Sequence, residues 1–432
     1  MNAPLIMVIY DGINNSVFDG QVIQPLIAHR TQHPNQPILL ISFERKHKTE
    51  FAKSIAQLQT HAIQLIVLKK YPLITRLPLL YACRQLHNIL RTFAHYQLLV
   101  RGPLAGYIAL HAHDTRRCTS LTIQARGLLA EEYIFSTRNI TGLAAWYHAY
   151  KVRLLKRIEH AVYGTANTNP RSISKLRYLM ISLISTVRSF DKLRMNGEEN
   201  SLALRKSAIV LTTAGNLLKD GQKMPLPAHP EPVEGSERKL EVSEFQKNST
   251  VQIQAVSTAL KNYLINTYGT HADHITIANH DIPPRICPAQ KLEWRAATRA
   301  TLAIADTTHV YCYNGSAKAW QCPHETVAYF KQQHTRNPDS LLLILTQDID
   351  VFTQIITQHG LSSTSYRIMH VAHAQIYHYL AACDTGIIMR DHTIINWTSR
   401  PTKILEYQSV GLTIAHNNSI GYLQEMKHSP SV

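Results

Sequence analysis

The 432-residue sequence lacks the cysteine pairing and the long apolar runs that mark several classes of protein. No two cysteines form a CxxC pair, and no stretch reaches the roughly 18 apolar residues that span a bilayer. The amino terminus, MNAPLIMVIYDG, has no basic region before its apolar run, so it does not resemble a signal peptide. These absences predict a cytoplasmic protein, either free or at the inner face of the membrane, with free thiols at Cys83, Cys118, Cys287, Cys312, Cys322 and Cys383.

Several catalytic signatures are also missing. The sequence contains no GxSxG, Walker A or GxGxxG motif, so it does not indicate an α/β-hydrolase, a P-loop NTPase or a dinucleotide enzyme, and we expect no cofactor. Its 24 histidines include HVAH (His370–His373) and HAHD (His111–Asp114). The spacing in these clusters fits no strong metal site, so no metal is predicted.

Acidic residues are scarce: the chain has 29 Asp and Glu but 45 Lys and Arg, which gives a formal net charge of +16. Nucleic acid, a phosphorylated small molecule or an anionic membrane surface could each attract such a charge. The basic residues are spread out and no RNP, KH or zinc-finger pattern is present, so nucleic acid is not predicted as a partner. The segment Leu68–Arg84 mixes basic residues with leucines, which fits either a membrane-surface segment or one packed on a sheet.

Short apolar runs alternate with helical stretches in the first part of the chain. An apolar run without polar alternation indicates a strand that is buried on both faces, as in a parallel sheet covered by helices. The first run ends at the turn Asp11-Gly12, and a helix is predicted from about Val17 to Arg30. The predicted strands are Pro4–Tyr10, Pro37–Glu44, Ile63–Lys69, Tyr96–Gly102 and Thr119–Gly127.

The C-terminal part repeats this rhythm. Its predicted strands are Thr308–Gly315, Ser340–Asp348, Tyr366–Ala372, Thr385–Arg390 and Leu412–Asn417. The fold class is therefore α/β, with two Rossmann-like, doubly wound domains. In such domains ligands bind at the carboxyl ends of the strands, so we expect a cleft between the two domains.

The alternation stops between about Asn167 and Thr250, where the chain is polar and contains prolines. Codons for RSFDKLRM (Arg188–Met195), read as their reverse complement, can encode HPELVEGS, and HPEPVEGS stands at His229–Ser236. We infer that a palindromic repeat has been translated in frame; coincidence is the alternative. Residues 167–250 are then a largely disordered insertion in an N-terminal domain of residues 1–166 and 251–285, followed by a C-terminal domain of residues 286–432.

The stretch NWTSRPTKILEYQSVG, Asn396–Gly411, predicts a short helix. Pro401 suits the first turn of a helix, where its missing N–H costs nothing, and Gly411 suits the end. Candidate caps for nearby donors are Asn396, Thr398 and Ser399.

The start of this helix has the chemistry of an anion site. Open N–H groups and the positive end of the helix dipole attract anions, and Thr402 and Lys403 add a hydroxyl and a cation suited to a diphosphate. Glu406 lies one turn after Thr402 on the same face, where its carboxylate could bind ribose hydroxyls. A surface helix with chance capping is the alternative.

The segment YLAACDTGIIMRDHTIINWTSRPTKILEYQSVGLTIA (Tyr379–Ala415) resembles the donor site of GT-B glycosyltransferases, close to the retaining, nucleotide-sugar-dependent glycosyltransferase family 4. VYCYNGSAKAWQCPHETVAYF resembles the loop after the first donor-domain strand, and YDGINNSVFDGQVIQPL and IQARGLLAEEY resemble acceptor-domain loops. AVSTALKNYL resembles the end of the acceptor domain, and ITIANHDI the interdomain linker. The resemblance covers nearly all of the chain outside the insertion.

This resemblance implies transfer of a sugar from a nucleotide-diphosphate sugar to a polysaccharide, a glycolipid or another cell-envelope acceptor. The implied donor-binding residues are Gly315, Ser316, Lys318, Asn396, Thr402, Lys403 and Glu406. The implied cleft or acceptor residues are Gly12, Gly20, Gln21, Arg126, Glu131 and Glu132. No residue is assigned as a general base.

The sequence departs from the family pattern at three points. Thr398 stands where many members carry a glutamate, the loop YNGSAKAW supplies Lys318 but no phosphate-binding arginine, and the C-terminal domain is expected to be truncated. Two other functions therefore stay open. One is a catalytically inactive relative that binds only nucleotide, and the other is a sugar-phosphate epimerase with the same two-domain fold, which would need an acidic residue and a histidine paired in the cleft.

Overall fold

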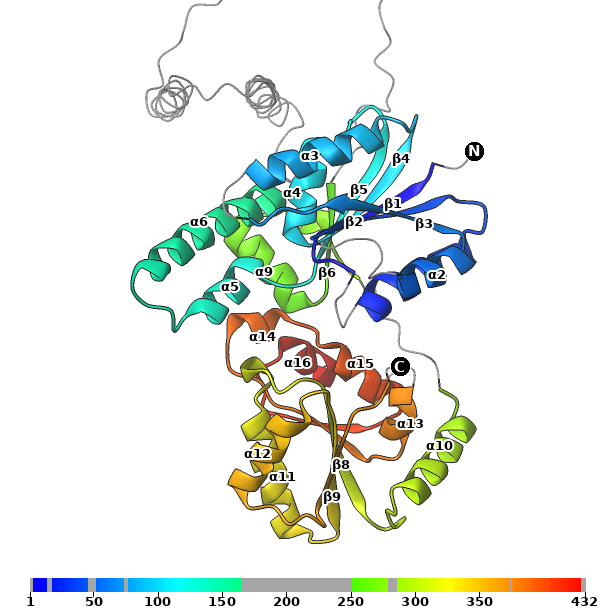
Figure 1. The fold of residues 1–432 in the computed structure, drawn as a ribbon, viewed down its shortest axis with the longest axis vertical. Coiled ribbons are helices and arrows are strands. Elements are labelled where there is room, and N and C mark those ends of the chain that lie inside the picture. The colour runs from blue at the N-terminus through cyan, green and yellow to red at the C-terminus, as the bar shows by residue number, and fades with distance from the viewer. Residues whose placement is uncertain are drawn as a thin grey trace, which may run out of the picture. The chain divides into compact units, whose positions relative to one another are not determined.

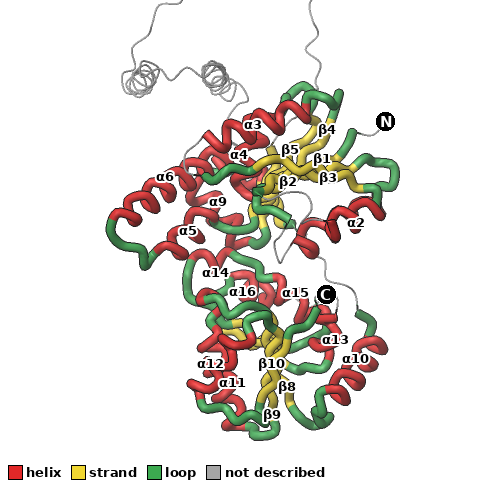
Figure 2. Tube along the Cα trace, in the orientation of Figure 1, coloured by secondary structure: helices red, strands yellow, loops and turns green. Residues whose placement is uncertain are grey.

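The computed structural model describes residues 3–13, 18–45, 52–73, 77–164, 251–278, 286–372 and 375–428. These residues fall within one compact unit that contains a seven-stranded and a five-stranded sheet. Helices surround each sheet (Figures 1 and 2). None of the described helices is both long and apolar enough to cross a membrane. The predicted insertion lies outside the described residues.

The seven-stranded sheet is parallel and has the order β3-β2-β1-β4-β5-β6-β7. Its strands are β1 (Leu5–Ile9), β2 (Ile38–Glu44), β3 (Ile63–Lys69), β4 (Tyr96–Arg101), β5 (Cys118–Ala125), β6 (Val251–Ala255) and β7 (Ile275–Ile277). Its helices are η1 (Asp19–Ile23), α1 (Gln24–Gln32), α2 (Ala52–Thr60), α3 (Leu77–Leu90), α4 (Gly102–Ala112), α5 (Leu129–Thr137), α6 (Leu143–Tyr163), α9 (Thr258–Tyr268) and η5 (Ala272–His274).

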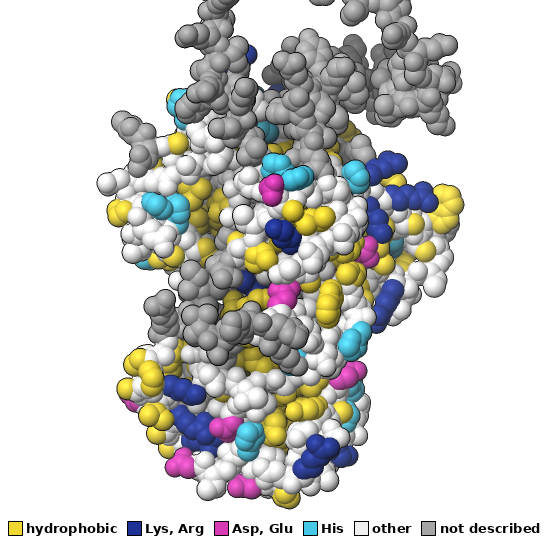
Figure 3. Space-filling view, turned by 180° about the vertical axis from the view of Figure 1, so that it is seen from behind, with side chains coloured by type: hydrophobic (Ala, Val, Ile, Leu, Met, Phe, Trp, Pro, Cys, Tyr) yellow, Lys and Arg dark blue, Asp and Glu magenta, His cyan; other side chains and the backbone are white. Residues whose placement is uncertain are grey.

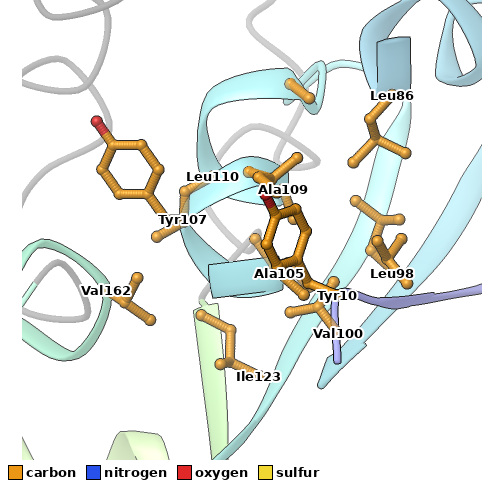
Figure 4. Packing of buried hydrophobic residues seen from close by; sticks show 14 of the residues in the cluster. Tyr10, Leu86, Leu98, Val100, Ala105, Tyr107, Ala109, Leu110, Ile123 and Val162 are labelled. Atoms are coloured by element: carbon orange, nitrogen blue, oxygen red, sulfur yellow. The ribbon is translucent and has the colours of Figure 1, made fainter. Parts of the chain in front are cut away.

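Both faces of this sheet are buried at β1 and β2, which explains why these two strands are almost entirely apolar. In β1, Ile6 and Val8 join a core that includes α3, α4 and α6, whereas Met7 and Ile9 join a second core with α1 and α2. Figure 4 shows α4 with Val162 of α6 on one side and with Leu86 of α3 and Leu98 of β4 on the other. The sheet is therefore doubly wound, as the apolar runs predict.

The five-stranded sheet is also parallel, in the order β10-β9-β8-β11-β12. Its strands are β8 (His309–Asn314), β9 (Ser340–Leu345), β10 (Tyr366–Met369), β11 (Thr385–Ile388) and β12 (Thr413–His416). Its helices are α10 (Pro288–Thr301), η6 (Ala319–Gln321), α11 (Pro323–Arg336), α12 (Ile349–His359), α13 (Ile376–Ala381), α14 (Ile394–Thr398), α15 (Thr402–Ser409) and α16 (Gly421–His428).

A partly buried cluster of charges ties α10 to this sheet. Asp384, just before β11, accepts hydrogen bonds from Arg295 at 2.8 Å, from Arg299 at 2.9 Å and from the Val310 N–H at 2.8 Å. The Arg299 side chain is 1% exposed and also donates to carbonyl groups around the start of β8. The aspartate of the sequence DTG thus fixes the alignment of β8, β11 and α10.

The observed strands confirm the predicted two-domain α/β fold. Two details differ from the predictions. Ile275–Ile277, which the resemblance placed in the interdomain linker, forms strand β7 because it pairs with β6. The predicted helix after β1 begins with a π-helical turn, η1, and its α-helical part runs to Gln32.

A buried carboxylate, Glu159 of α6, joins three helices. Its Oε1 accepts a hydrogen bond from the Ala130 N–H in the first turn of α5 at 3.3 Å, and its Oε2 accepts one from the Tyr268 hydroxyl of α9 at 3.0 Å. Glu159 is completely buried, and this burial raises its pKa to about 7. In the unfolded chain the carboxyl group has its ordinary pKa, so it loses its proton at a lower pH than in the folded protein.

We expect the free energy of unfolding to fall as pH rises from about 4.5 to about 7, because the folded protein holds a proton on Glu159 that the unfolded chain has released. The loss is on the order of 3 kcal/mol. Urea titrations over this pH range should show that Glu159→Gln removes this part of the slope, and that Glu131→Gln, the matched control at a partly exposed ion pair, keeps it. Equal slopes in wild type and Glu159→Gln would contradict this role.

Candidate functional site

A pocket of about 630 Å³ lies at the carboxyl ends of β8, β9 and β10. The first turns of α15 form one wall, and residues of η1 also line it. This is the position at which a parallel sheet with a reversal in strand order binds its ligands. The lining residues are Gly20, Gln21, Asn314, Gly315, Ser316, Lys318, Gln321, Leu345, Thr346, Gln347, Asp348, His370, Val371, Ile376, Tyr377, Thr402, Lys403, Leu405 and Glu406.

The N-terminus of α15 has no side-chain cap. Pro401 has an extended conformation at the N-cap position, so the helix begins at Thr402, one residue later than the sequence suggested. Within the described part of the chain, the backbone N–H groups of Thr402 and Lys403 have no hydrogen-bond acceptor. Both residues line the pocket, so the positive end of the helix dipole is available to an anion there.

The three candidate caps belong to the preceding helix instead. Thr398 donates its hydroxyl hydrogen bond to the Ile394 carbonyl at 2.8 Å, and Ser399 donates to the Asn396 carbonyl at 2.9 Å. The sequence could not exclude a cap at these positions, because α14 and α15 are separated by only three residues.

Lys403 is a buried cation directed at the loop after β8. Its side chain donates a hydrogen bond from Nζ to Gln321 Oε1 at 2.9 Å and lies 4.2 Å from the centre of the Tyr313 ring. Burial lowers the pKa of Lys403 well below its ordinary value, Arg390 lowers it further, and Glu406 partly opposes this shift. An anion in the pocket would offset the cost of burying this charge.

Gly315 brings the backbone close to this cation. Its φ of +143° is unfavourable for other residues, and a Cβ atom here would lie 3.0 Å from Lys403 Nζ. The adjacent Asn314 donates from Nδ2 to Glu406 Oε2 at 2.5 Å, which links β8 to α15. Buried Asn314 Oδ1 has no hydrogen-bond partner in the described residues, so one acceptor at this site is available.

The position of α15 depends on the absence of a side chain at Gly386 of β11. A Cβ atom at Gly386 would lie 2.3 Å from the ring of Tyr407, which is completely buried against the strand. The Tyr407 hydroxyl accepts a hydrogen bond from the Asn314 N–H at 3.3 Å. The glycine of DTG therefore lets α15 pack closely, and this packing sets the location of Thr402 and Lys403.

The pocket brings together eight of the thirteen residues that the sequence assigned to the site. These are Gly315, Ser316, Lys318, Thr402, Lys403 and Glu406 on the donor side, and Gly20 and Gln21 on the other. Five do not line it: Asn396, Gly12, Arg126, Glu131 and Glu132.

For three of these five, the structure shows what holds them away from the pocket. Asn396 donates its side-chain hydrogen bond to the Asp391 carbonyl at 2.9 Å, and Glu131 forms an ion pair with Lys156 at 3.2 Å. Gly12 has a φ of +92°, and the turn that it forms is held by buried Glu44, which accepts the Ile13 N–H at 2.7 Å.

Three polar residues that the sequence did not predict support the pocket. Arg390 follows β11, is 5% exposed, and donates hydrogen bonds to Gln321 Oε1 and to the Trp320 carbonyl. Gln321 thus accepts from both Arg390 and Lys403. Arg101, at the end of β4, holds Gln21 Oε1 at 2.6 Å and Asp11 at 2.8 Å. A charged residue ending an apolar strand was the available signal for both arginines.

The described residues contain no group of three or more His, Cys, Asp or Glu side chains that could hold a metal ion. The pocket combines a helix N-terminus, one buried lysine and a close glycine backbone, a set of groups that favours an anion. A neighbouring carboxylate, Glu406, can accept hydrogen bonds.

Comparisons with solved structures support the fold. A glycosyltransferase from Rickettsia africae ESF-5 has a TM-score of 0.53 and 12% identity, covering 99% of this chain and 83% of that one. The lipopolysaccharide outer core galactosyltransferase WaaB, in its apo form, has a TM-score of 0.52 and 11% identity, covering 98% and 83%. At such low identity these matches establish the GT-B fold only. No family model and no curated protein matches the sequence.

Replacing the buried lysine tests the anion site. We expect Lys403→Met to leave the melting temperature of the ligand-free protein unchanged or higher, since it removes a buried charge. It should weaken binding of pyrophosphate roughly 10- to 150-fold, because a charge-assisted hydrogen bond is lost. Calorimetric titration with pyrophosphate compares the affinity of Lys403→Met with that of wild type. The control variant is Lys331→Met, which changes an exposed lysine on α11. Unchanged pyrophosphate affinity in Lys403→Met would contradict the assignment.

Proposed function

We propose that this chain is a GT-B glycosyltransferase that moves a sugar from a nucleotide-diphosphate sugar to a polysaccharide, glycolipid or other cell-envelope acceptor. One observation carries the proposal. The uncapped start of α15, buried Lys403, the close backbone at Gly315 and the carboxylate of Glu406 all line one pocket of a GT-B fold. That combination suits a nucleoside diphosphate better than an uncharged ligand.

The diphosphate would lie between the first turn of α15 and Ser316, in the loop that follows β8. The Thr402 and Lys403 N–H groups and the Lys403 ammonium would neutralise its charge, with exposed Lys318 at the rim. As the bond to the sugar breaks, negative charge grows on the leaving diphosphate. Donors already fixed at that position stabilise the transition state without reorganisation.

The nucleoside would extend from the diphosphate along α15. Glu406 lies one turn beyond Thr402, within reach of ribose hydroxyls. Beyond it, Val371, Ile376 and Tyr377 provide apolar and aromatic surface for a base.

The sugar and the acceptor would enter from the side of η1. Gln21 lines the pocket there, and its orientation is fixed by Arg101, which Asp11 holds in turn. We therefore infer that Arg101 positions Gln21 for contact with the transferred sugar. The acceptor would be a glycan or a lipid-linked molecule, and an anionic membrane surface would be a further partner.

One feature favours the second candidate, a relative that binds nucleotide without transferring sugar. Thr398, where many family members carry a carboxylate, is completely buried and bonded to the Ile394 carbonyl, and it does not line the pocket. A contact to a sugar hydroxyl would then be missing, although the nucleotide site would be intact.

Titration with UDP, GDP and their sugar conjugates, followed by an assay for donor hydrolysis, separates these functions. We expect a nucleoside diphosphate to bind, and Glu406→Ala to weaken its binding roughly 10- to 150-fold through the loss of charged hydrogen bonds to ribose. Gln408→Ala, an exposed change on the same helix, is the control.

The outcomes are distinct. Failure of every nucleotide to bind at millimolar concentration would refute the donor site, and unchanged binding in Glu406→Ala would remove the role of that carboxylate. Binding without hydrolysis or transfer would favour the inactive relative.

A further inference from the structure

Helix α6 exposes a continuous row of aromatic and basic side chains. Trp146, Tyr150, Arg153 and Arg157 follow the spacing i, i+4, i+7, i+11, which places them on one face of the helix, and all four are exposed. We call this row the α6 stripe. Trp146 is 84% exposed and Tyr150 47%. Such large aromatic surfaces are uncommon on a face that contacts only water.

The opposite face of α6 packs into the protein core. Leu154, Leu155 and Ile158 are buried, and the helix packs against α4 and α5. The aromatic residues of the stripe therefore contribute nothing to the core. Two further exposed apolar side chains, Tyr147 and Ile140, lie close to Trp146 in sequence.

The charge around the stripe has one sign. Residues 133–158 contain no Asp or Glu, and their five Lys and Arg residues are Arg138, Lys151, Arg153, Lys156 and Arg157. Among the described residues, only Lys156 in this group has a carboxylate partner, Glu131 at 3.2 Å. In Figure 3, Lys and Arg side chains lie beside hydrophobic ones along the edge of the molecule to which α6 belongs. Positive charge is thus combined with exposed aromatic surface on this helix.

We propose that the α6 stripe docks on an anionic membrane surface. Trp and Tyr favour the boundary between headgroups and acyl chains because one part of each ring system is apolar and the other forms hydrogen bonds. The arginines would pair with lipid phosphates, each adding attraction near an anionic surface. A helix that lies flat in the interface needs no membrane-spanning length.

One other occupant of the stripe and one other membrane-facing surface fit the observations less well. A second copy of this chain would bring arginines against arginines, because a symmetric contact places the same patch on both sides. The basic segment Leu68–Arg84 also exposes Leu77 and Tyr81 on α3. Its aromatic rings already have partners, however, because Tyr81 contacts Tyr71 with ring centres 5.2 Å apart and Lys69 lies 5.1 Å from the Tyr71 ring.

This inference deepens the proposed function, on which it rests for its biological meaning: a glycolipid acceptor would be held in the same membrane. Vesicle binding does not require nucleotide, however. Membrane binding by the stripe can therefore be tested even if the protein binds no nucleotide. Nucleotide binding can likewise be tested even if the protein binds no vesicles.

The test is vesicle flotation of the full chain. We expect binding to phosphatidylcholine vesicles that contain phosphatidylglycerol, little binding to pure phosphatidylcholine, and loss of binding at high salt. Trp146→Ala with Tyr150→Ala should lower the partition coefficient about tenfold or more. Arg153→Gln with Arg157→Gln should lower it roughly 30-fold. All four side chains are exposed, so the variants should keep the wild-type melting temperature.

Two double variants serve as controls. Arg116→Gln with Arg336→Gln removes the same charge from exposed positions elsewhere, and Leu77→Ala with Tyr81→Ala removes exposed apolar surface from α3. Both should bind vesicles as wild type does. The proposal is overturned if wild type does not float with anionic vesicles, if only the α3 variant loses binding, or if sedimentation shows a dimer that the Trp146 variant dissociates.

Discussion

The buried ammonium group of Lys403 is the constraint around which the C-terminal pocket is built. A charge without water must be compensated by neighbouring groups. Here the compensation comes from Gln321, from the face of the Tyr313 ring and, more distantly, from Glu406. These contacts leave the lysine with a lowered pKa, so the ligand-free site is electrostatically incomplete. A diphosphate would raise that pKa again, which means that part of the cost of burying the lysine is recovered only when the ligand is bound.

The geometry of the site follows from two close contacts behind the lysine. Tyr407 lies against Gly386, and this contact sets the depth of α15 on the sheet. Asp384, just before β11, accepts hydrogen bonds from Arg295, from Arg299 and from the backbone at the start of β8. The pair of strands β8 and β11 is therefore also fixed at the end where both strands begin. The sequence DTG therefore acts on the pocket without lining it. An alanine at Gly386 would change the location of Lys403 even though it touches no ligand.

The strands and the start of α15 could be predicted from the sequence because they depend on local signals. Apolar runs identify strands buried on both faces. The motif PTK followed by Glu406 correctly places a helix start and a carboxylate one turn later, and the anion at this helix start stays a prediction. Residues that act through tertiary contacts gave weaker signals. Arg390 and Gln321 meet Lys403 only because β11, η6 and α15 converge. Asn396 and Glu131 have suitable chemistry for a cleft, but a backbone carbonyl and a lysine already engage them.

The most direct test of the account is hydrogen exchange at the first amides of α15. The N–H groups of Thr402 and Lys403 have no acceptor among the described residues, so they should exchange rapidly in the ligand-free protein. Mass spectrometry of peptides spanning this turn should show slower exchange when a saturating nucleoside diphosphate is present. Exchange at these amides that does not change, although the nucleotide is bound, would show that the diphosphate does not occupy the start of α15.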